Sequence, residues 1–229
     1  MTQPDAVMIF AAGFGTRMGA LTADRPKPLI SVAGRPLIDH ALDLAQSVKP
    51  RRIVVNTHYK AEVLHEHLKS HGVLVSHEAD QILDTGGGLK NARPLLDSDC
   101  VFTLNPDVAW KGPNPLTTLL SCWNAHDMDA LLLCVPTSRA IGRIGGGDFS
   151  ADIQARISRG GDLVYTGAQI VKPALLDRIS EPVFSLNTLW DLLINEGRAA
   201  AAEYPGTWCD VGRPDGIVRA EHMLGNVDV

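Results

Sequence analysis

Short apolar runs alternate with stretches of helical periodicity along most of the chain. The apolar runs are rich in β-branched residues and have no polar face, which is typical of strands buried on both sides of a parallel sheet. We therefore predict strands at residues 6–11, 52–57, 73–77, 100–104, 130–135 and 163–171, and helices at residues 38–48, 61–70, 115–125, 186–195 and 214–224. This order indicates an α/β fold with a mixed, mainly parallel sheet sandwiched between helix layers.

The second half of the chain is less regular. Turn residues at 145–147, 152–153 and 160–162 predict short antiparallel strands between them. Residues 199–203 and 206–210 are expected to complete the sheet. No low-complexity linker and no internal repeat divides the 229 residues, so we expect a single domain over residues 1–229.

The motif that says most about function follows the first predicted strand. Residues 7–10 lead into Ala-Ala-Gly-Phe-Gly-Thr-Arg-Met at 11–18, and Pro-Lys-Pro-Leu follows at 26–29. Small residues let a backbone approach a ligand closely and direct successive N–H groups at an anion. Arg17 and Lys27 add two cations in a segment too rich in Pro and Gly to be a helix. We interpret this segment as a nucleoside triphosphate site.

Two common phosphate motifs do not fit this segment. Gly13, Gly15 and Gly19 fall as G-x-G-x-x-x-G, which is one residue longer than the dinucleotide fingerprint. No Gly-Lys-Ser/Thr follows, so the Walker pattern is absent as well. The alternative is a simple strand-to-loop turn with an exposed arginine, but the pattern extends from Ala11 to Ile38.

This patterned span resembles the signature of the sugar-1-phosphate nucleotidyltransferases, which join a nucleoside triphosphate to a sugar 1-phosphate and release pyrophosphate. Later landmarks of the resemblance lie at residues 83–88, 105–108 and 208–212. One departure is Ala20, where the family has proline. Within the family, the resemblance is closest to the short uridylyltransferases that act on N-acetylmuramic acid 1-phosphate. It implies a Rossmann-like (GT-A-like) fold, and the chain stops too soon for the C-terminal β-helix domain that many relatives carry.

The resemblance also assigns binding residues. It implies nucleotide contacts, largely through the backbone, from Ala11, Ala12, Gly13, Gly15, Thr16, Arg17, Gly86, Gly87 and Asn105. It places sugar contacts at Gly147, Gly167 and Asn187. Simpler structural roles stay open for two of these groups. Residues 86–88 can be a flexible turn that opens a helix at 89–96, and Asn187 can cap the helix that follows it.

Two aspartates are candidates for a metal. Asp107 follows the apolar strand at 100–104, where an uncompensated carboxylate would be costly, although a turn or a cap would also explain it. Asp210 lies in an otherwise apolar run before a glycine. Mg²⁺ favours a few carboxylates together with phosphate oxygens and water. The resemblance matches both aspartates to the metal-binding pair of the family, while Pro106 replaces a small residue usual there.

The expected chemistry is the attack of a sugar phosphate oxygen on the α-phosphorus, with pyrophosphate leaving in line. Catalysis then consists of positioning and charge neutralisation. Arg17 is expected to hold the β- and γ-phosphates, and Lys27 the α-phosphate and the attacking phosphate. UTP with N-acetylmuramic acid 1-phosphate is the first substrate pair. Mannose 1-phosphate with GTP, a phosphocholine-type cytidylyl transfer and a non-catalytic nucleotide-sugar sensor are the alternatives.

Composition excludes several partners. A net charge of −5 argues against non-specific binding to nucleic acid, and no apolar stretch is long enough to span a membrane. The N-terminus lacks the architecture of a signal peptide. Four cysteines without a C-x-x-C pair indicate buried free thiols in a reducing cytoplasm and give no sign of zinc. His65, His67 and His71 are expected to face water on a polar helix, and the protein to be a monomer or a homodimer.

Overall fold

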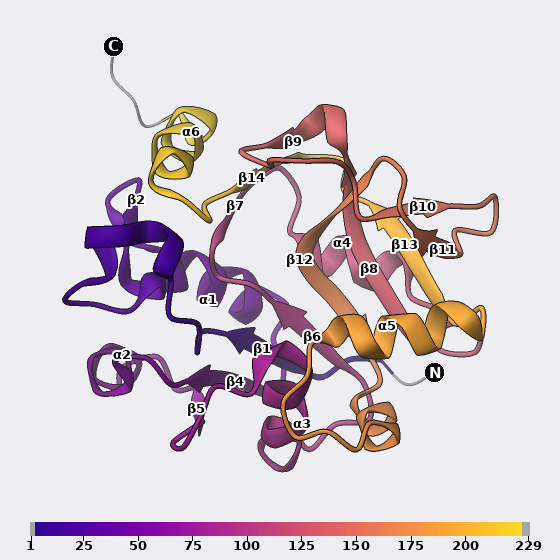
Figure 1. The fold of residues 1–229 in the computed structure, drawn as a ribbon, viewed down its shortest axis with the longest axis horizontal. Helices are drawn as coiled ribbons and strands as arrows, with labels where there is room; N and C mark the ends of the chain where they lie inside the picture. The colour runs from indigo at the N-terminus through magenta and orange to yellow at the C-terminus, as the bar shows by residue number, and fades with distance from the viewer. Residues whose placement is uncertain (1–2, 226–229) are drawn as a thin grey trace.

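The computed structural model describes residues 3–225, so both ends of the predicted 1–229 domain lie outside the described residues. A mixed sheet forms its centre (Figure 1), in the order β11 (Ile157–Arg159), β10 (Phe149–Ala151), β12 (Leu163–Val171), β6 (Val101–Leu104), β1 (Ala6–Phe10), β4 (Arg52–Thr57) and β5 (Leu74–His77). Strands β6, β1, β4 and β5 are parallel to one another. The expected mixed α/β fold is confirmed.

Both faces of the sheet are covered by helices, as expected. Along β1, Val7 and Ile9 face one core, and Ala6 and Met8 face another. The first core is completed by α1 (Leu37–Ser47), α2 (Ala61–Leu68) and α4 (Pro115–Cys122). The second is completed by α3 (Asp84–Leu96) and α5 (Leu186–Asn195). Burial on both faces explains why the parallel strands are continuously apolar.

The second half of the main sheet is antiparallel around β12. This strand pairs with β6 on one side and with β8 (Ala130–Pro136) on the other. Strand β13 (Ala199–Glu203) extends the sheet by pairing parallel to β8, and β10 and β11 form the predicted short antiparallel pair. The register of β12 shifts between Tyr165 and Gln169, and Gly167 lies within that irregularity with φ +88°.

One expectation and one of the open alternatives about the elements are wrong. The segment at 206–210 was expected to complete the main sheet, but β14 (Thr207–Asp210) forms a separate sheet with β7 (Val108–Lys111) and β9 (Ala140–Ile141). Figure 1 shows this smaller sheet between β12 and α6 (Pro214–Leu224). The glycines at 86–88 are not a turn, because α3 already begins at Asp84. Neighbouring segments pack so closely on all three glycines that a side chain would collide with them.

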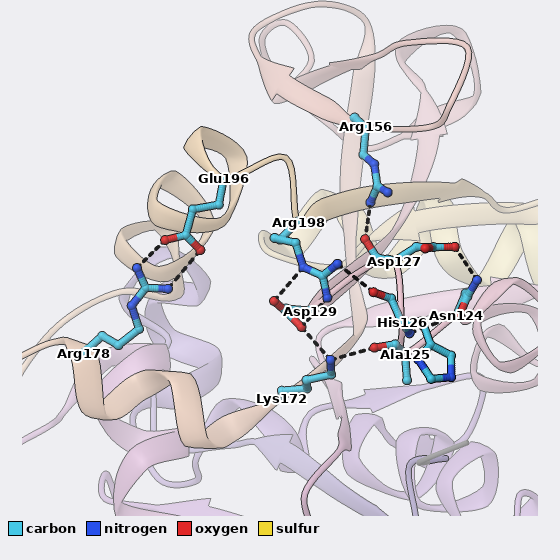
Figure 2. A network of polar contacts seen from close by, with 10 residues as sticks. All are labelled: Asn124, Ala125, His126, Asp127, Asp129, Arg156, Lys172, Arg178, Glu196 and Arg198. Atoms are coloured by element: carbon cyan, nitrogen blue, oxygen red, sulfur yellow. Dashed lines mark hydrogen bonds and ion pairs between the residues drawn. The ribbon is translucent and has the colours of Figure 1, made fainter.

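A polar network fastens the end of the sheet opposite to the pockets described below. Figure 2 shows Asp129, just before β8, between Arg198 and Lys172. The Arg198 guanidinium donates to Asp129 at 2.9 and 3.0 Å, and the Lys172 ammonium does so at 2.6 Å. The network therefore ties β8, β12 and β13 together. It also gives Lys172 a structural partner in Asp129.

The cysteines and the helices were used above to predict where the protein is located in the cell. Cys100, Cys134 and Cys209 are buried free thiols, as expected, whereas Cys122 at the end of α4 is exposed. Burial raises the pKa of Cys100 to about 12, so this thiol stays protonated. Among residues 3–225, no helix combines the length and the apolar character that crossing a membrane requires.

Candidate functional site

Three pockets meet where β1 and β6 end, around Asp107. Their volumes are about 290, 330 and 200 Å³, and Phe10 and Asp107 line all three. In open α/β sheets, ligands gather at the carboxyl ends of the strands. We name the three pockets by the groups that line them. The pocket of about 290 Å³ is the cation pocket, that of about 330 Å³ is the arginine pocket, and that of about 200 Å³ is the glutamate pocket.

The cation pocket is built by the loop after β1. It is lined by Gly13, Gly15, Thr16, Arg17 and Lys27 together with Asp107, so it gathers most of the residues that the motif predicted. Gly15 has φ +65°, and a Cβ on it would lie 2.8 Å from the Cβ of Lys27. Only glycine therefore lets the loop lie directly on the lysine stem.

Lys27 and Asp107 form an ion pair that is mostly buried. The lysine side chain is 10% exposed and the aspartate side chain 28%. Burial acts to raise the pKa of Asp107, but the charges of Lys27 and Arg17 outweigh it and hold that pKa below its usual value. An ammonium has three N–H donors, so one bond to Asp107 leaves two donors for phosphate oxygens.

Asp210 comes to the same place from the smaller sheet. It pairs with Val108 across the β7–β14 ladder, and the N–H of Val211 donates to the carbonyl of Asp107 at 2.9 Å. Burial and the nearby charge of Asp107 raise the pKa of Asp210. Arg17 lies at this junction too, because a Cβ on Gly212 would be 3.4 Å from its Nη1 and 2.8 Å from Asp210 Oδ1.

The two carboxylates have the donor chemistry of a Mg²⁺ site. Asp107 offers Oδ2 to Lys27, and Asp210 accepts the Gly212 N–H through Oδ1 at 2.7 Å, which leaves each of them a second oxygen. Burial is the larger cause of the raised pKa of Asp210, and the negative charge of Asp107 adds to it. A divalent cation bound between them would relieve that repulsion.

The glutamate pocket contains a buried network that the sequence analysis missed. The Ala11 N–H donates to Asn56 Oδ1 at 2.7 Å, and Asn56 Nδ2 donates to Glu78 Oε1 at 2.7 Å. Glu78 is only 3% exposed and also accepts the Leu83 N–H at 2.8 Å. Ala11 thus gives its N–H to Asn56, and the predicted nucleotide-binding residues that line this pocket are Ala12, Gly13 and Asn105.

Glu78 could have been found from its position. It directly follows the strand at 73–77, just as Asp107 follows the strand at 100–104. The reasoning that picked out Asp107 therefore applies equally to Glu78.

Gly86 and Gly87 of α3 contact the segment before α5. The N–H groups of Gly86 and Gly87 both donate to the Phe184 carbonyl, at 2.9 and 3.0 Å. Neither glycine lines the three pockets, whereas the preceding Asp84 and Thr85 line two of them. At this end of α3, the residues that line the pockets are therefore Asp84 and Thr85, and a nucleotide contact by Gly86 and Gly87 stays a prediction.

The arginine pocket includes two of the three predicted sugar-binding residues. Gly167 and Asn187 line it with Asn105, whose N–H donates to the Gly167 carbonyl at 2.8 Å. Gly147 does not line it, because this residue packs on the backbone at 161–163. The cap of α5 is Ser185 and not Asn187, and the Asn187 side chain bonds to Arg159.

Arginines on this pocket were also missed by the sequence analysis. Arg143 and Arg159 both line it. Arg159 uses three of its five N–H donors, because it bonds to Asp191 at 2.7 Å and to the side chain and carbonyl of Asn187. Arg143 bonds to one oxygen of Asp148 at 2.6 Å, and the other oxygen of Asp148 accepts the Tyr165 N–H. A single bond leaves most of the Arg143 guanidinium donors for a ligand.

Comparison with known proteins agrees with this geometry. The profile of the MobA-like NTP transferase domain matches residues 7–203. N-acetylmuramate alpha-1-phosphate uridylyltransferase of Caulobacter vibrioides is 37% identical over 96% of this chain and 97% of its own length. Mannose-1-phosphate guanyltransferase of Pichia angusta is 28% identical over 90% of this chain and 60% of its own length.

A solved structure shares the fold at low sequence identity. The inositol-1-phosphate CTP transferase from T. maritima superposes with a TM-score of 0.80 at 16% identity, over 99% of this chain and 97% of that one. The expected enzyme class is confirmed by the profile and by the relatives. The chain therefore belongs to the MobA-like NTP transferases and is a sugar-1-phosphate nucleotidyltransferase, the group that its motifs resemble.

Proposed function

We propose that the protein transfers the uridylyl group of UTP to N-acetylmuramic acid 1-phosphate, giving the UDP-sugar and pyrophosphate, and that Mg²⁺ supports the reaction. The observation that carries the proposal is the cation pocket, where Arg17 and Lys27 lie with Asp107 at the end of β1. The choice of UTP and of this sugar rests on the relative from Caulobacter vibrioides.

The reaction makes one P–O bond and breaks another. A phosphate oxygen of the sugar 1-phosphate attacks the α-phosphorus, and the bond to the β-phosphate breaks. Arg17 pairs with the β- and γ-phosphates and stabilises the leaving pyrophosphate, while the two spare donors of Lys27 hold the α-phosphate and the incoming phosphate. Mg²⁺ held by Asp107 and Asp210 would neutralise further phosphate charge.

The arginine pocket supports an acidic sugar. N-acetylmuramic acid carries a carboxylate, and arginine binds carboxylates through a planar fork of N–H donors. Arg143 has the spare donors for this contact. Mannose 1-phosphate with GTP is the second candidate, because the relative from Pichia angusta is a mannose-1-phosphate guanyltransferase. Mannose has no carboxylate for Arg143 to bind.

Pyrophosphate release tests the proposal. Purified protein is assayed with Mg²⁺ and each of four NTPs against N-acetylmuramic acid 1-phosphate, N-acetylglucosamine 1-phosphate, mannose 1-phosphate and phosphocholine. We expect release to require all three components and to be fastest with UTP and the muramic acid derivative. Faster turnover of GTP with mannose 1-phosphate would identify the second candidate. Nucleotide binding without any release would refute an enzymatic role and leave a sensor.

One substitution isolates the carboxylate contact. N-acetylglucosamine 1-phosphate is the same sugar without the acidic substituent. Arg143→Gln should lower kcat/KM for the muramic acid derivative about tenfold or more and leave the value for the glucosamine derivative unchanged. Arg139→Gln is the matched control, because Arg139 pairs with Glu203 outside the pocket. Equal losses on both sugars would remove Arg143 from the recognition of the carboxylate.

We also propose that the protein works in the cytoplasm. Its four cysteines are all free, and three of them are buried. Free thiols persist where glutathione and thioredoxin keep the compartment reduced.

A further inference from the structure

A second group of potential metal ligands lies outside the three pockets. Asp39 on α1, His67 on α2 and His71 in the turn after α2 direct one ligand atom each to a common point, with all three atoms within 4.8 Å of one another. His67 Nε2 lies 2.6 Å from Asp39 Oδ1, and His71 Nε2 lies 3.7 Å from the same oxygen. None of the three residues lines the pockets around Asp107.

The surroundings of these side chains differ from the sequence expectation that the histidines face water. The side chains of Asp39, His67 and His71 are 17%, 27% and 25% exposed. The two imidazole rings are stacked, with centroids 5.1 Å apart and planes 27° apart. Because the two histidines are four residues apart, they lie on one side of the helical turn. Stacking then holds them side by side against Asp39.

The hydrogen bonds of His71 leave a lone pair directed at the carboxylate. His71 Nδ1 lies 3.1 Å from the carbonyl oxygen of His67. A carbonyl only accepts, so Nδ1 carries the proton, and Nε2 of the neutral ring has a free lone pair. A lone pair that faces a carboxylate oxygen suits a shared cation. Histidine ligands of metals commonly donate their other N–H to a backbone carbonyl, which is the arrangement of His71.

The spacing suits a transition ion. Zn²⁺ binds imidazole nitrogen and carboxylate oxygen at about 2.0–2.2 Å, which places tetrahedral ligands about 3.3 Å apart. The separations of 2.6 and 3.7 Å from Asp39 Oδ1 lie on either side of that value, and the two histidine nitrogens lie within 4.8 Å of each other, so small rearrangements of the side chains would complete the site. Imidazole ligands favour Zn²⁺, Co²⁺ or Ni²⁺ over Mg²⁺, which prefers oxygen.

We propose that Asp39, His67 and His71 form a binding site for a divalent transition metal ion of the Zn²⁺ class, separate from the Mg²⁺ carboxylates. The ion would take the place of the proton on His67 Nε2 and leave at least one position for water. Because its ligands come from α1, α2 and the turn that follows α2, it would fasten the end of α2 to α1. Its expected role is structural.

The test measures metal binding directly. The protein is titrated with Co²⁺, read out by visible d–d absorption, and with Zn²⁺ by calorimetry, both with excess Mg²⁺ to occupy Asp107 and Asp210. We expect one saturable site per chain and an increase of Tm with Zn²⁺ but not with further Mg²⁺. His67→Gln and His71→Gln should weaken binding on the order of 100-fold.

Two controls keep the result specific. His65→Gln alters a histidine of the same helix whose Nε2 contacts Thr57 Oγ1 at 2.7 Å, and it should bind Zn²⁺ as the unmodified protein does. Asp107→Asn should also retain this site. His71→Gln removes the 3.7 Å contact with Asp39, the hydrogen bond to the His67 carbonyl and the ring stacking on His67. All three contacts lie at the end of α2, so we expect this variant to fold without metal, and circular dichroism and Tm are measured first to check that it does.

The proposal is overturned if the unmodified protein shows no saturable Co²⁺ or Zn²⁺ binding under these conditions. It is equally overturned if folded His71→Gln binds as tightly as the unmodified protein, or if His65→Gln weakens binding as much as His71→Gln does. Pyrophosphate release is measured in parallel and should be the same with and without Zn²⁺ at saturating Mg²⁺. Failure of the proposed substrates would therefore leave this result unaffected.

Discussion

Replacing Lys27 by methionine separates the electrostatic role of the ammonium from the packing of its stem. Methionine keeps most of the side-chain volume, so the contact of Gly15 with the stem persists while the positive charge is lost. If the ammonium stabilises charge that develops at the α-phosphate, its loss should raise the barrier by about 3 kcal/mol. This is a fall of about a hundredfold or more in kcat/KM.

The Lys27–Asp107 ion pair also determines how much stability the Lys27→Met variant should lose. Removing one partner of a fully buried pair costs about 3–5 kcal/mol of stability, because the other charge is left uncompensated. Asp107 keeps 28% of its side chain exposed, so water can screen it in part, and we expect a loss of about 2 kcal/mol. Asp107 would also lose its strongest neighbouring charge, and its pKa should rise.

The assay combines pyrophosphate release with urea unfolding. Lys27→Met should lose activity and stability, and Lys27→Met with Asp107→Asn should regain stability without regaining activity, since the orphaned charge is removed. Arg25→Met is the matched control, because Arg25 belongs to the same segment and forms an exposed ion pair with Asp24. Lys27→Met with kcat/KM within about threefold of the unmodified protein, or a double variant no more stable than the single one, would refute the reasoning.

Three further substitutions test other parts of the structure. The hydrogen bonds from Arg198 and the ion pair with Lys172 outweigh burial and lower the pKa of Asp129, so this carboxylate stabilises the fold above its unfolded pKa and loses that effect as pH falls. Asp129→Asn should cost about 2 kcal/mol in urea unfolding at pH 7, and the difference should close below about pH 4; a constant difference would contradict this. Gly167→Ala places a Cβ 2.8 Å from Asn105 Cβ at φ +88°, so it should lower the free energy of unfolding by about 1–3 kcal/mol and raise the KM of both substrates. Gly197→Ala is the control, because Gly197 has open space around it at φ +65°, and its effects should be smaller. Glu78→Gln turns an amide N–H₂ toward one of the two N–H donors that Glu78 accepts from, those of Asn56 and Leu83. It should raise KM for the NTP but not for the sugar phosphate, and an unchanged KM for the NTP would exclude Glu78 from the nucleotide site.

The parts of the site that follow a strand could be predicted from the sequence. An apolar run fixes a buried strand, and the residues just after it must lie at the edge of the sheet where ligands bind. This reasoning is sufficient for Arg17 on the loop after β1 and for Asp107 after β6, and the structure places both in one pocket. Lys27 was predicted from the Pro-Lys-Pro-Leu motif at residues 26–29, and it lines the same pocket.

Pairing between distant segments could not be predicted. Strands β7 and β14 lie about a hundred residues apart in the chain, and each is too short to show a pattern of its own. Their pairing places Asp210 beside Asp107 and removes β14 from the main sheet. The sheet assigned to the Asp210 segment was therefore wrong, and a role of Asp210 in metal binding stays a prediction that its position beside Asp107 supports. Likewise, nothing in the sequence relates Asp39 to His67 before α1 packs beside α2.

The glycines of α3 show how one sequence signal supports two physical explanations. Glycine permits close approach of a ligand, but it permits close approach of another chain segment equally well. At Gly86 and Gly87 the neighbour is the 182–184 segment, which accepts both N–H groups through Phe184. A ligand role and a packing role would give the same sequence, so only the three-dimensional neighbours decide between them.

The charges around Asp107 connect the fold to the chemistry. Lys27 and Arg17 act on two carboxylates whose pKa values move in opposite directions, with that of Asp107 lowered and that of Asp210 raised. A chain selected only for stability would not keep a half-buried acid whose ionisation its neighbour opposes. The repulsion has a use if a cation and a polyphosphate enter together, because the cation relieves the carboxylates while the phosphates engage Arg17 and the free donors of Lys27. The repulsion between the two acids and the affinity that we expect for a cation together with a polyphosphate would then have the same origin.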